Sequence, residues 1–135
     1  MQYGSCQCGA VAFASEGPAL ALYICHCREC RKQSASAFGM SLTVPRSGFS
    51  LVRGAPKFWT RPTDSGNTLR CAFCPECGSR LWHEGSATPA TLTIKAGALD
   101  EPVDPSDAIH IWTSRKLPGI AIPPGATQYP QEPPG

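Results

Sequence analysis

Residues 74–78 read Cys-Pro-Glu-Cys-Gly, the pattern of a zinc knuckle. Two thiolates three residues apart converge on one ion, and the glycine after them lets the backbone fold back towards the sulfurs. Residues 6–9, Cys-Gln-Cys-Gly, are a shorter form of the same device. Because tetrahedral Zn²⁺ accepts four thiolates, the two half-sites predict one closed, structural zinc site. Its ligands are Cys6, Cys8, Cys74 and Cys77.

Whether the eight cysteines bind metal or form disulfides depends on how reducing the protein's cellular compartment is. The first residues, MQYGSCQCG, show no basic stretch and no apolar signal region, so nothing indicates secretion. No apolar run approaches the roughly 18 residues of a membrane helix. We therefore expect a cytoplasmic protein that is not bound to a membrane. In a reducing compartment clustered cysteines bind metal more often than each other, and a disulfide framework is the less favoured alternative.

The charge of the chain also changes with metal. The formal net charge is +2, and seven thiolates that hold two Zn²⁺ ions would change it to −1. A nearly neutral loaded protein has no general attraction for nucleic acid or an anionic membrane. We expect no nucleic-acid partner, and the sequence leaves a homodimer open.

A second cluster, Cys25, Cys27 and Cys30, offers three sulfurs. Three protein ligands and one open position is the catalytic arrangement of zinc, whereas four ligands make a closed site. The eighth cysteine, Cys71, is the candidate for a fourth ligand. If it closes the site, the chain is a non-catalytic zinc module that binds a protein, peptide or nucleic acid.

Strand alternation bears on Cys71. If TLRCAF at 68–73 is a strand, Cys71 points away from the face that serves Cys74. It then faces either the second metal or the core, and we favour the core because a free cysteine often packs as a small hydrophobic residue.

The pattern of the chain predicts a mainly β domain at residues 1–116 and a Pro-rich tail at 117–135 that is extended and partly mobile. Fourteen prolines and thirteen glycines favour short strands joined by turns. Residues 28–36 suit one or two helical turns. A turn at residues 3–14 leads into a short strand, and further strands are expected at 19–25, 38–44, 49–53, 57–61, 68–73, 80–83, 91–96 and 108–112.

Four segments in this order resemble one known family. They read GSCQCGAV at 4–11, CHCRECRK at 25–32, FCPECGS at 73–79 and HIW at 110–112. Together they are similar to the glutathione-dependent formaldehyde-activating enzyme family, also called the GFA/CENP-V domain, over about residues 3–116. The resemblance implies a tent-like, zinc-stabilised fold of coiled antiparallel sheets.

The resemblance also implies roles and a reaction. It assigns the four cysteines of the two knuckles to a structural zinc and Cys25, Cys27 and Cys30 to a second, catalytic zinc. The family condenses formaldehyde with glutathione to S-hydroxymethylglutathione, which makes it a carbon–sulfur lyase in the reverse direction. Glutathione is then the expected co-substrate, and a small thiol the expected partner.

The chain departs from the family pattern in three places. Ala35 stands where a glycine is usual, Gly119 follows Pro118 where an aromatic residue is common, and Cys71 is not part of the pattern. The second and third departures concern the substrate pocket more than the fold.

The expected mechanism is capture of a thiol at the open position of the second zinc, where the metal lowers the thiol pKa. Arg28, Arg31 and Lys32 are candidates to attract the carboxylates of glutathione, the alternative being a solvated helix face. His26 lies between two ligands and is expected to form a hydrogen bond rather than to bind metal. His83 gives no functional signal.

Overall fold

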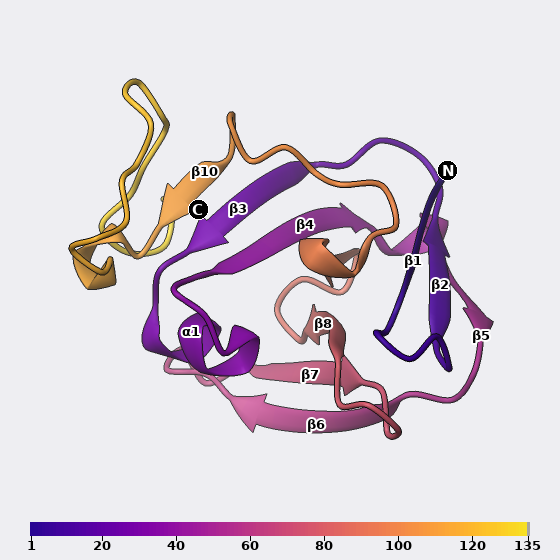
Figure 1. Ribbon diagram of the computed structural model, residues 1–135. Helices are drawn as coiled ribbons and strands as arrows, with labels where there is room; N and C mark the ends of the chain where they lie inside the picture. The colour runs from indigo at the N-terminus through magenta and orange to yellow at the C-terminus, as the bar shows by residue number, and fades with distance from the viewer. Residues whose placement is uncertain (135) are drawn as a thin grey trace.

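The computed structural model describes residues 1–134, and Gly135, the last residue of the predicted tail, lies outside the described residues. Two sheets form the fold (Figure 1). The smaller sheet is antiparallel and contains β1 (Gln2–Ser5), β2 (Ala12–Ser15) and β5 (Phe49–Arg53). The mainly β prediction is confirmed.

The larger sheet has seven strands, and Figure 1 shows it curling from β3 and β4 at the top to β7 and β6 at the bottom. Every pairing between named strands in residues 1–134 is antiparallel except that of β10 with β3. In spatial order the strands are β10 (Ile109–Ile111), β3 (Ala21–Cys25), β4 (Gly39–Pro45), β9 (Thr91–Lys95), β8 (Arg80–Gly85), β7 (Thr68–Phe73) and β6 (Lys57–Pro62).

One face of the larger sheet forms the core with the smaller sheet. Leu42, Ile94 and Trp82 lie opposite one another across β4, β9 and β8, so their side chains share this face. The Trp82 ring lies 5.8 Å from the ring of Phe13 and 4.8 Å from that of Phe49. Each large apolar side chain buried here contributes about 1.5–3 kcal/mol. The core therefore occupies one side of the larger sheet only.

The other face of the larger sheet carries polar and reactive side chains. Trp59, Cys71 and His83 lie opposite one another across β6, β7 and β8. Lys95 lies opposite Ser41 in the neighbouring strands β9 and β4. Because facing residues of paired strands point to the same side, these groups form one surface, opposite to the apolar core.

A short helix, α1 (Arg28–Ser34), follows β3. The Cys27 sulfur caps its first turn by accepting a hydrogen bond from the Cys30 amide at 3.3 Å. The helix ends at Ala35, which has left-handed backbone angles (φ 51°, ψ 39°). Three 3₁₀ turns complete the elements, at Arg46–Gly48, Ala96–Ala98 and Thr113–Arg115. In residues 1–134 no helix combines the length and apolarity that crossing a bilayer would require.

Ala35 gives a testable consequence, because a left-handed residue with a Cβ costs roughly 1–2 kcal/mol. Ala35→Gly is expected to raise the free energy of unfolding by about 0.5 kcal/mol, the strain relieved less the extra freedom of glycine in the unfolded chain. Urea unfolding measures this change. Ala37→Gly is the matched control, since Ala37 has no positive φ, and it should lower stability. Equal destabilisation by both substitutions would contradict strain at Ala35.

The segment after the third 3₁₀ turn runs alongside β10. The Thr127 carbonyl accepts from the His110 amide, and the Tyr129 amide donates to the His110 carbonyl, both at 2.9 Å. The Trp112 indole donates to Glu132 at 2.8 Å. Residues 127–131 of the tail thus hydrogen-bond to β10 and the turn after it, whereas turns at Leu117–Ile120 and Pro123–Ala126 interrupt the part before them. The separation of the tail from the domain at residue 117 and its partial mobility stay predictions.

Candidate metal centres

The first cysteine cluster joins the two predicted knuckles. The Cys8 sulfur lies 3.6 Å from that of Cys6 and 3.7 Å from that of Cys74. A tetrahedral ion with zinc–sulfur bonds of about 2.3 Å holds its sulfurs about 3.8 Å apart, so these spacings fit zinc. A disulfide needs about 2.05 Å, and all eight cysteines are free. The sulfurs of Cys6, Cys8, Cys74 and Cys77 all lie within 4.8 Å of one another.

Backbone turns present these sulfurs. Gly78 has a φ of 82° and donates its amide to the Cys74 carbonyl at 2.9 Å, which closes the knuckle. The Cys74 sulfur accepts from the Glu76 amide at 3.4 Å. Hydrogen bonds from the side chain and backbone of Ser79 lower the pKa of Cys77 to about 5. The surroundings of Cys77 therefore favour the thiolate, the form in which cysteine binds metal, whereas burial and the neighbouring sulfurs raise the pKa of Cys8 to about 12.

The second cluster lies where β3 meets α1. Cys25 ends the strand, and the sulfurs of Cys25, Cys27 and Cys30 lie within 4.8 Å of one another. The Gln33 amide donates to the Cys30 sulfur at 3.6 Å. Gly39 of β4 leaves room here, because a Cβ on it would lie 3.1 Å from the Cβ of Cys30.

Without a cation, the three sulfurs of the second cluster can share only one thiolate, with the other two as thiols. Hydrogen bonds from the thiols of Cys25 and Cys30 lower the pKa of Cys27 to about 2. The sulfurs of Cys27 and then Cys30 raise the pKa of Cys25 through their hydrogen bonds with it. Three sulfurs this close cannot all be thiolates without a positive charge among them, and a divalent ion supplies that charge. The donor set therefore fits Zn²⁺.

Cys71 lies outside both groups. It is buried (3% exposed), and its sulfur is 4.0 Å from the carbonyl of Leu69. Its neighbour Ala72 belongs to the core that contains Cys74, so Cys71 faces the opposite side, as alternation predicts. The structure thus brings three sulfurs together in the second cluster and leaves the eighth cysteine apart. The ligand roles of the individual cysteines stay predictions.

A cavity of about 200 Å³ lies beside the second cluster, between α1 and the reactive face of the larger sheet. Glu29, Lys32 and Gln33 line it from α1, and Cys71 and His83 line it from β7 and β8. Gln33 also donates to Cys30, so one residue that lines the cavity contacts the three-sulfur group. The cavity is therefore the hollow of the larger sheet's polar face that lies nearest to the second cluster through Gln33.

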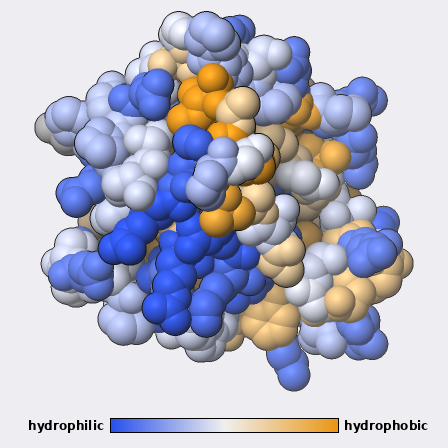
Figure 2. Space-filling view, turned by 60° about the vertical axis from the view of Figure 1, so that its left-hand side comes forward, coloured by the Kyte–Doolittle hydropathy of each residue, from blue (hydrophilic) through white to orange (hydrophobic). Residues whose placement is uncertain are grey.

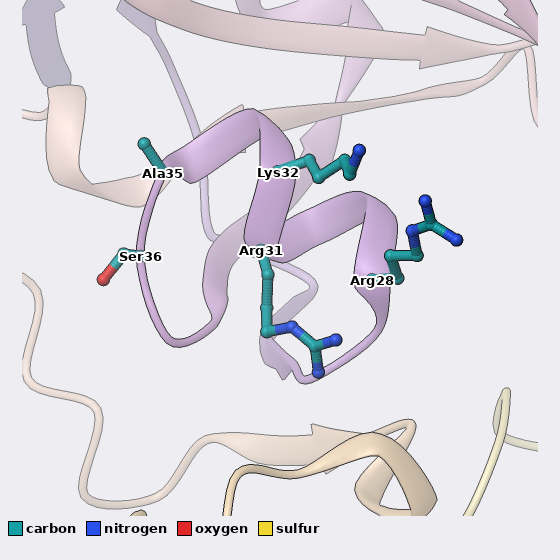
Figure 3. Close-up of a pocket in the computed structure, with 5 residues that line it drawn as sticks. All are labelled: Arg28, Arg31, Lys32, Ala35 and Ser36. Carbon is teal, nitrogen blue, oxygen red and sulfur yellow. The ribbon is translucent and has the colours of Figure 1, made fainter.

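The three basic residues of α1 have different surroundings. They line an open hollow of about 410 Å³ with Ala35 and Ser36 (Figure 3). Arg31 donates to the carbonyls of His26 at 3.2 Å and Arg115 at 2.6 Å, so it joins the helix to the segment after β10.

Arg28 and Lys32 extend towards one side of the helix, away from Arg31 (Figure 3). Figure 2 turns the left-hand side of Figure 1, where α1 and β10 lie, towards the viewer and shows a broad hydrophilic area on this face. The two ion pairs of residues 1–134 both involve Glu84, so none of the three cations has an acidic partner there.

His26 forms the hydrogen bond that its position predicts. Its Nε2 lies 2.9 Å from Nδ1 of His110, and both side chains are buried. Burial lowers the pKa of each ring. Nδ1 of His26 has no partner within residues 1–134. The pair joins the loop of the second cluster to β10, beside which the tail runs.

Two residues of the site were missed in the sequence. The Lys95 ammonium lies 2.8 Å from Nδ1 of His83, and His83 lines the cavity. Burial lowers the pKa of Lys95 to about 8 although Cys30, Cys71 and Cys25 oppose that shift. The signal is that these polar residues, on consecutive strands, point to the same face of the sheet. It can be recognised only once the register of the strands is known.

The fold and the clusters define a class: a mainly β domain with a four-cysteine site and a three-cysteine site that could bind zinc. The chain belongs to the glutathione-dependent formaldehyde-activating enzyme family, whose sequence model matches residues 1–115. A crystal structure of a Rhodobacter sphaeroides protein is similar, with 26% identity and a TM-score of 0.61 over 78% of this chain and 93% of that one. No curated protein matches the chain.

Proposed function

We propose that this protein is a zinc-dependent carbon–sulfur lyase that forms and cleaves a small thiol–aldehyde adduct. The proposed adduct is S-hydroxymethylglutathione, formed from formaldehyde and glutathione. The observation that carries the proposal is the three-sulfur cluster with a cavity, rather than a fourth sulfur, beside it. Membership of the family supports the choice of reaction.

The reaction is an addition without oxidation. The thiolate sulfur attacks the aldehyde carbon, a carbon–sulfur bond forms, and the π electrons of the carbonyl move to its oxygen. The proton lost by the thiol is balanced by one that this oxygen takes up. A zinc ion held by Cys25, Cys27 and Cys30 would lower the pKa of the thiol, so that thiolate is present near neutral pH.

Glutathione carries two carboxylates, and cations near the cavity would orient it. Lys32 borders both the hollow and the cavity, and Arg28 lies beside it on α1. Both lack acidic partners within residues 1–134. Arg31 contributes less in this scheme, because its guanidinium already donates to two carbonyls.

Exchange spectroscopy with ¹³C-formaldehyde and glutathione tests the activity. The zinc-loaded protein is expected to accelerate exchange between free formaldehyde and the hydroxymethyl adduct well above the spontaneous rate. Cysteamine, a thiol without carboxylates, should be a poorer substrate. Exchange at the spontaneous rate with glutathione and with other small thiols, in protein that carries two zinc ions, would refute the lyase.

Lys32→Met tests the electrostatic part. One exposed ion pair is worth up to about 1 kcal/mol, so KM for glutathione should rise about fivefold with kcat nearly unchanged. The effect should shrink as salt is added. Lys57→Met, which removes an exposed lysine of β6, is the matched control and should leave KM unaltered. An equal change in both variants would show that only the overall charge matters.

A further inference from the structure

His83 and Lys95 form a half-buried pair without an acidic partner in residues 1–134. The Lys95 Nζ lies 2.8 Å from Nδ1 of His83, and the two ion pairs of the described residues involve neither of them. A half-buried lysine loses part of its hydration, and here it gains no carboxylate partner in return.

The contact fixes the proton on the imidazole. An ammonium has three N–H donors and no lone pair, so Nδ1 of His83 must accept this hydrogen bond and carries no proton. Burial, followed by the charges of Lys95, Arg61 and Arg80, lowers the pKa of His83 to about 3. The ring is therefore neutral near pH 7, and its one proton lies on Nε2.

His83 also faces the cavity next to the second cluster. It lines the cavity that lies against the second cluster, opposite the α1 residues Glu29 and Lys32. Its strand partner Cys71 lines the same cavity, and the negative sulfurs that act on Lys95 include those of Cys25 and Cys30. The pair thus lies on the side of the sheet where the proposed substrate enters.

We propose that His83 is a catalytic residue that donates a hydrogen bond from Nε2 to the substrate oxygen in this cavity, and that Lys95 is a positioning residue that holds His83 in the required tautomer. This proposal rests on the proposed function, and it identifies a residue that would stabilise the transition state of that reaction.

The chemistry gives this donor a purpose. As the carbon–sulfur bond forms, negative charge gathers on the former carbonyl oxygen, and it returns to that oxygen when the hydroxymethyl adduct breaks down. A neutral imidazole donor stabilises this charge without having to lose its own proton. Removing one such preorganised donor costs about 10²–10³ in kcat.

Kinetics of the zinc-loaded variants form the first test. His83→Leu is expected to lower kcat by about 10²–10³ with a small change in KM for glutathione. His83→Gln keeps an N–H donor and should retain more activity. Lys95→Met should lower kcat less than His83→Leu, and Lys95→Arg should restore part of the loss. Unchanged kcat in His83→Leu that still binds two zinc ions would overturn the proposal and leave the lyase standing.

Nitrogen NMR of the histidine rings forms the second test and needs no activity. In zinc-loaded wild-type protein at pH 7, His83 should show the pattern of a neutral ring protonated at Nε2. Lys95→Met should shift it towards a mixture of tautomers. A ring protonated at Nδ1, or at both nitrogens, would overturn the proposal whatever the outcome for glutathione. Failure of the proposed function would instead appear as a wild-type protein without exchange activity.

Discussion

Replacing Cys74 with serine is expected to leave the domain unfolded and to abolish binding of both zinc ions. Cys74 is fully buried (0% exposed) and belongs to the group that joins residues 6–8 to residues 74–77. Structural zinc contributes about 10–16 kcal/mol in small zinc domains, whereas the net stability of a domain is about 5–15 kcal/mol. The free energy lost with this site is therefore about as large as the domain's entire net free energy of unfolding.

Circular dichroism and zinc content measure the effect. Cys71→Ala is the matched control, because it removes an equally buried cysteine that lies outside both clusters. It should keep both zinc ions and cost about 1–2 kcal/mol for the small cavity. A folded Cys74→Ser protein with two zinc ions would show that the first cluster does not hold the domain together.

Cys27→Ser is expected to have the opposite profile, loss of activity with retention of the fold. Its sulfur belongs to the three-sulfur group, so the variant should bind one zinc ion instead of two and exchange formaldehyde only at the spontaneous rate. The cap of α1 survives, because serine is a good N-cap and its hydroxyl can accept from the Cys30 amide in place of the sulfur.

Zinc content, exchange spectroscopy and urea unfolding on the same sample separate these effects. The free energy of unfolding should fall by no more than about 2 kcal/mol. Retained turnover with one zinc lost would remove the second cluster from catalysis. Global unfolding would show that this cluster, too, is structural.

The strands of the sheet could be predicted well because each carries a local signal. Residues 49–53 and 68–73 form strands with the expected bounds, and 21–25 lies within the expected 19–25. Turn residues and alternating apolar side chains suffice for such short elements. β1 was expected as part of a turn, because its four residues become a strand only through pairing with β2.

The cysteine clusters could also be predicted, since thiolates at knuckle spacing have few other uses in a small chain. What depends on distant parts of the chain could not. The parallel pairing of β10 with β3 and the path of the tail along β10 join segments with no shared local pattern. Arg31 looked like a free cation because the Arg115 carbonyl that it contacts is far away in sequence.

The same limit explains His83 and Lys95. Each is an isolated polar residue in a strand, and only the register of β7, β8 and β9 puts them beside Cys71 and the cavity. One residue of slip would turn each side chain to the other face. Ala35 differs in kind: the family pattern marked the position, and its left-handed conformation gives the physical reason why glycine is usual there.

X-ray absorption at the zinc edge, on protein of known zinc content, tests directly whether one ion is saturated by sulfur and the other is not. Four sulfurs on one ion and three on the other average 3.5 sulfurs per zinc, at about 2.3 Å. A nitrogen or oxygen atom would then complete the coordination of the three-sulfur ion. Two zinc ions per chain with that average are the expected result. Two ions with four sulfurs each would mean that Cys71 or another chain closes the second site, and the proposed lyase would have no place to bind its thiol.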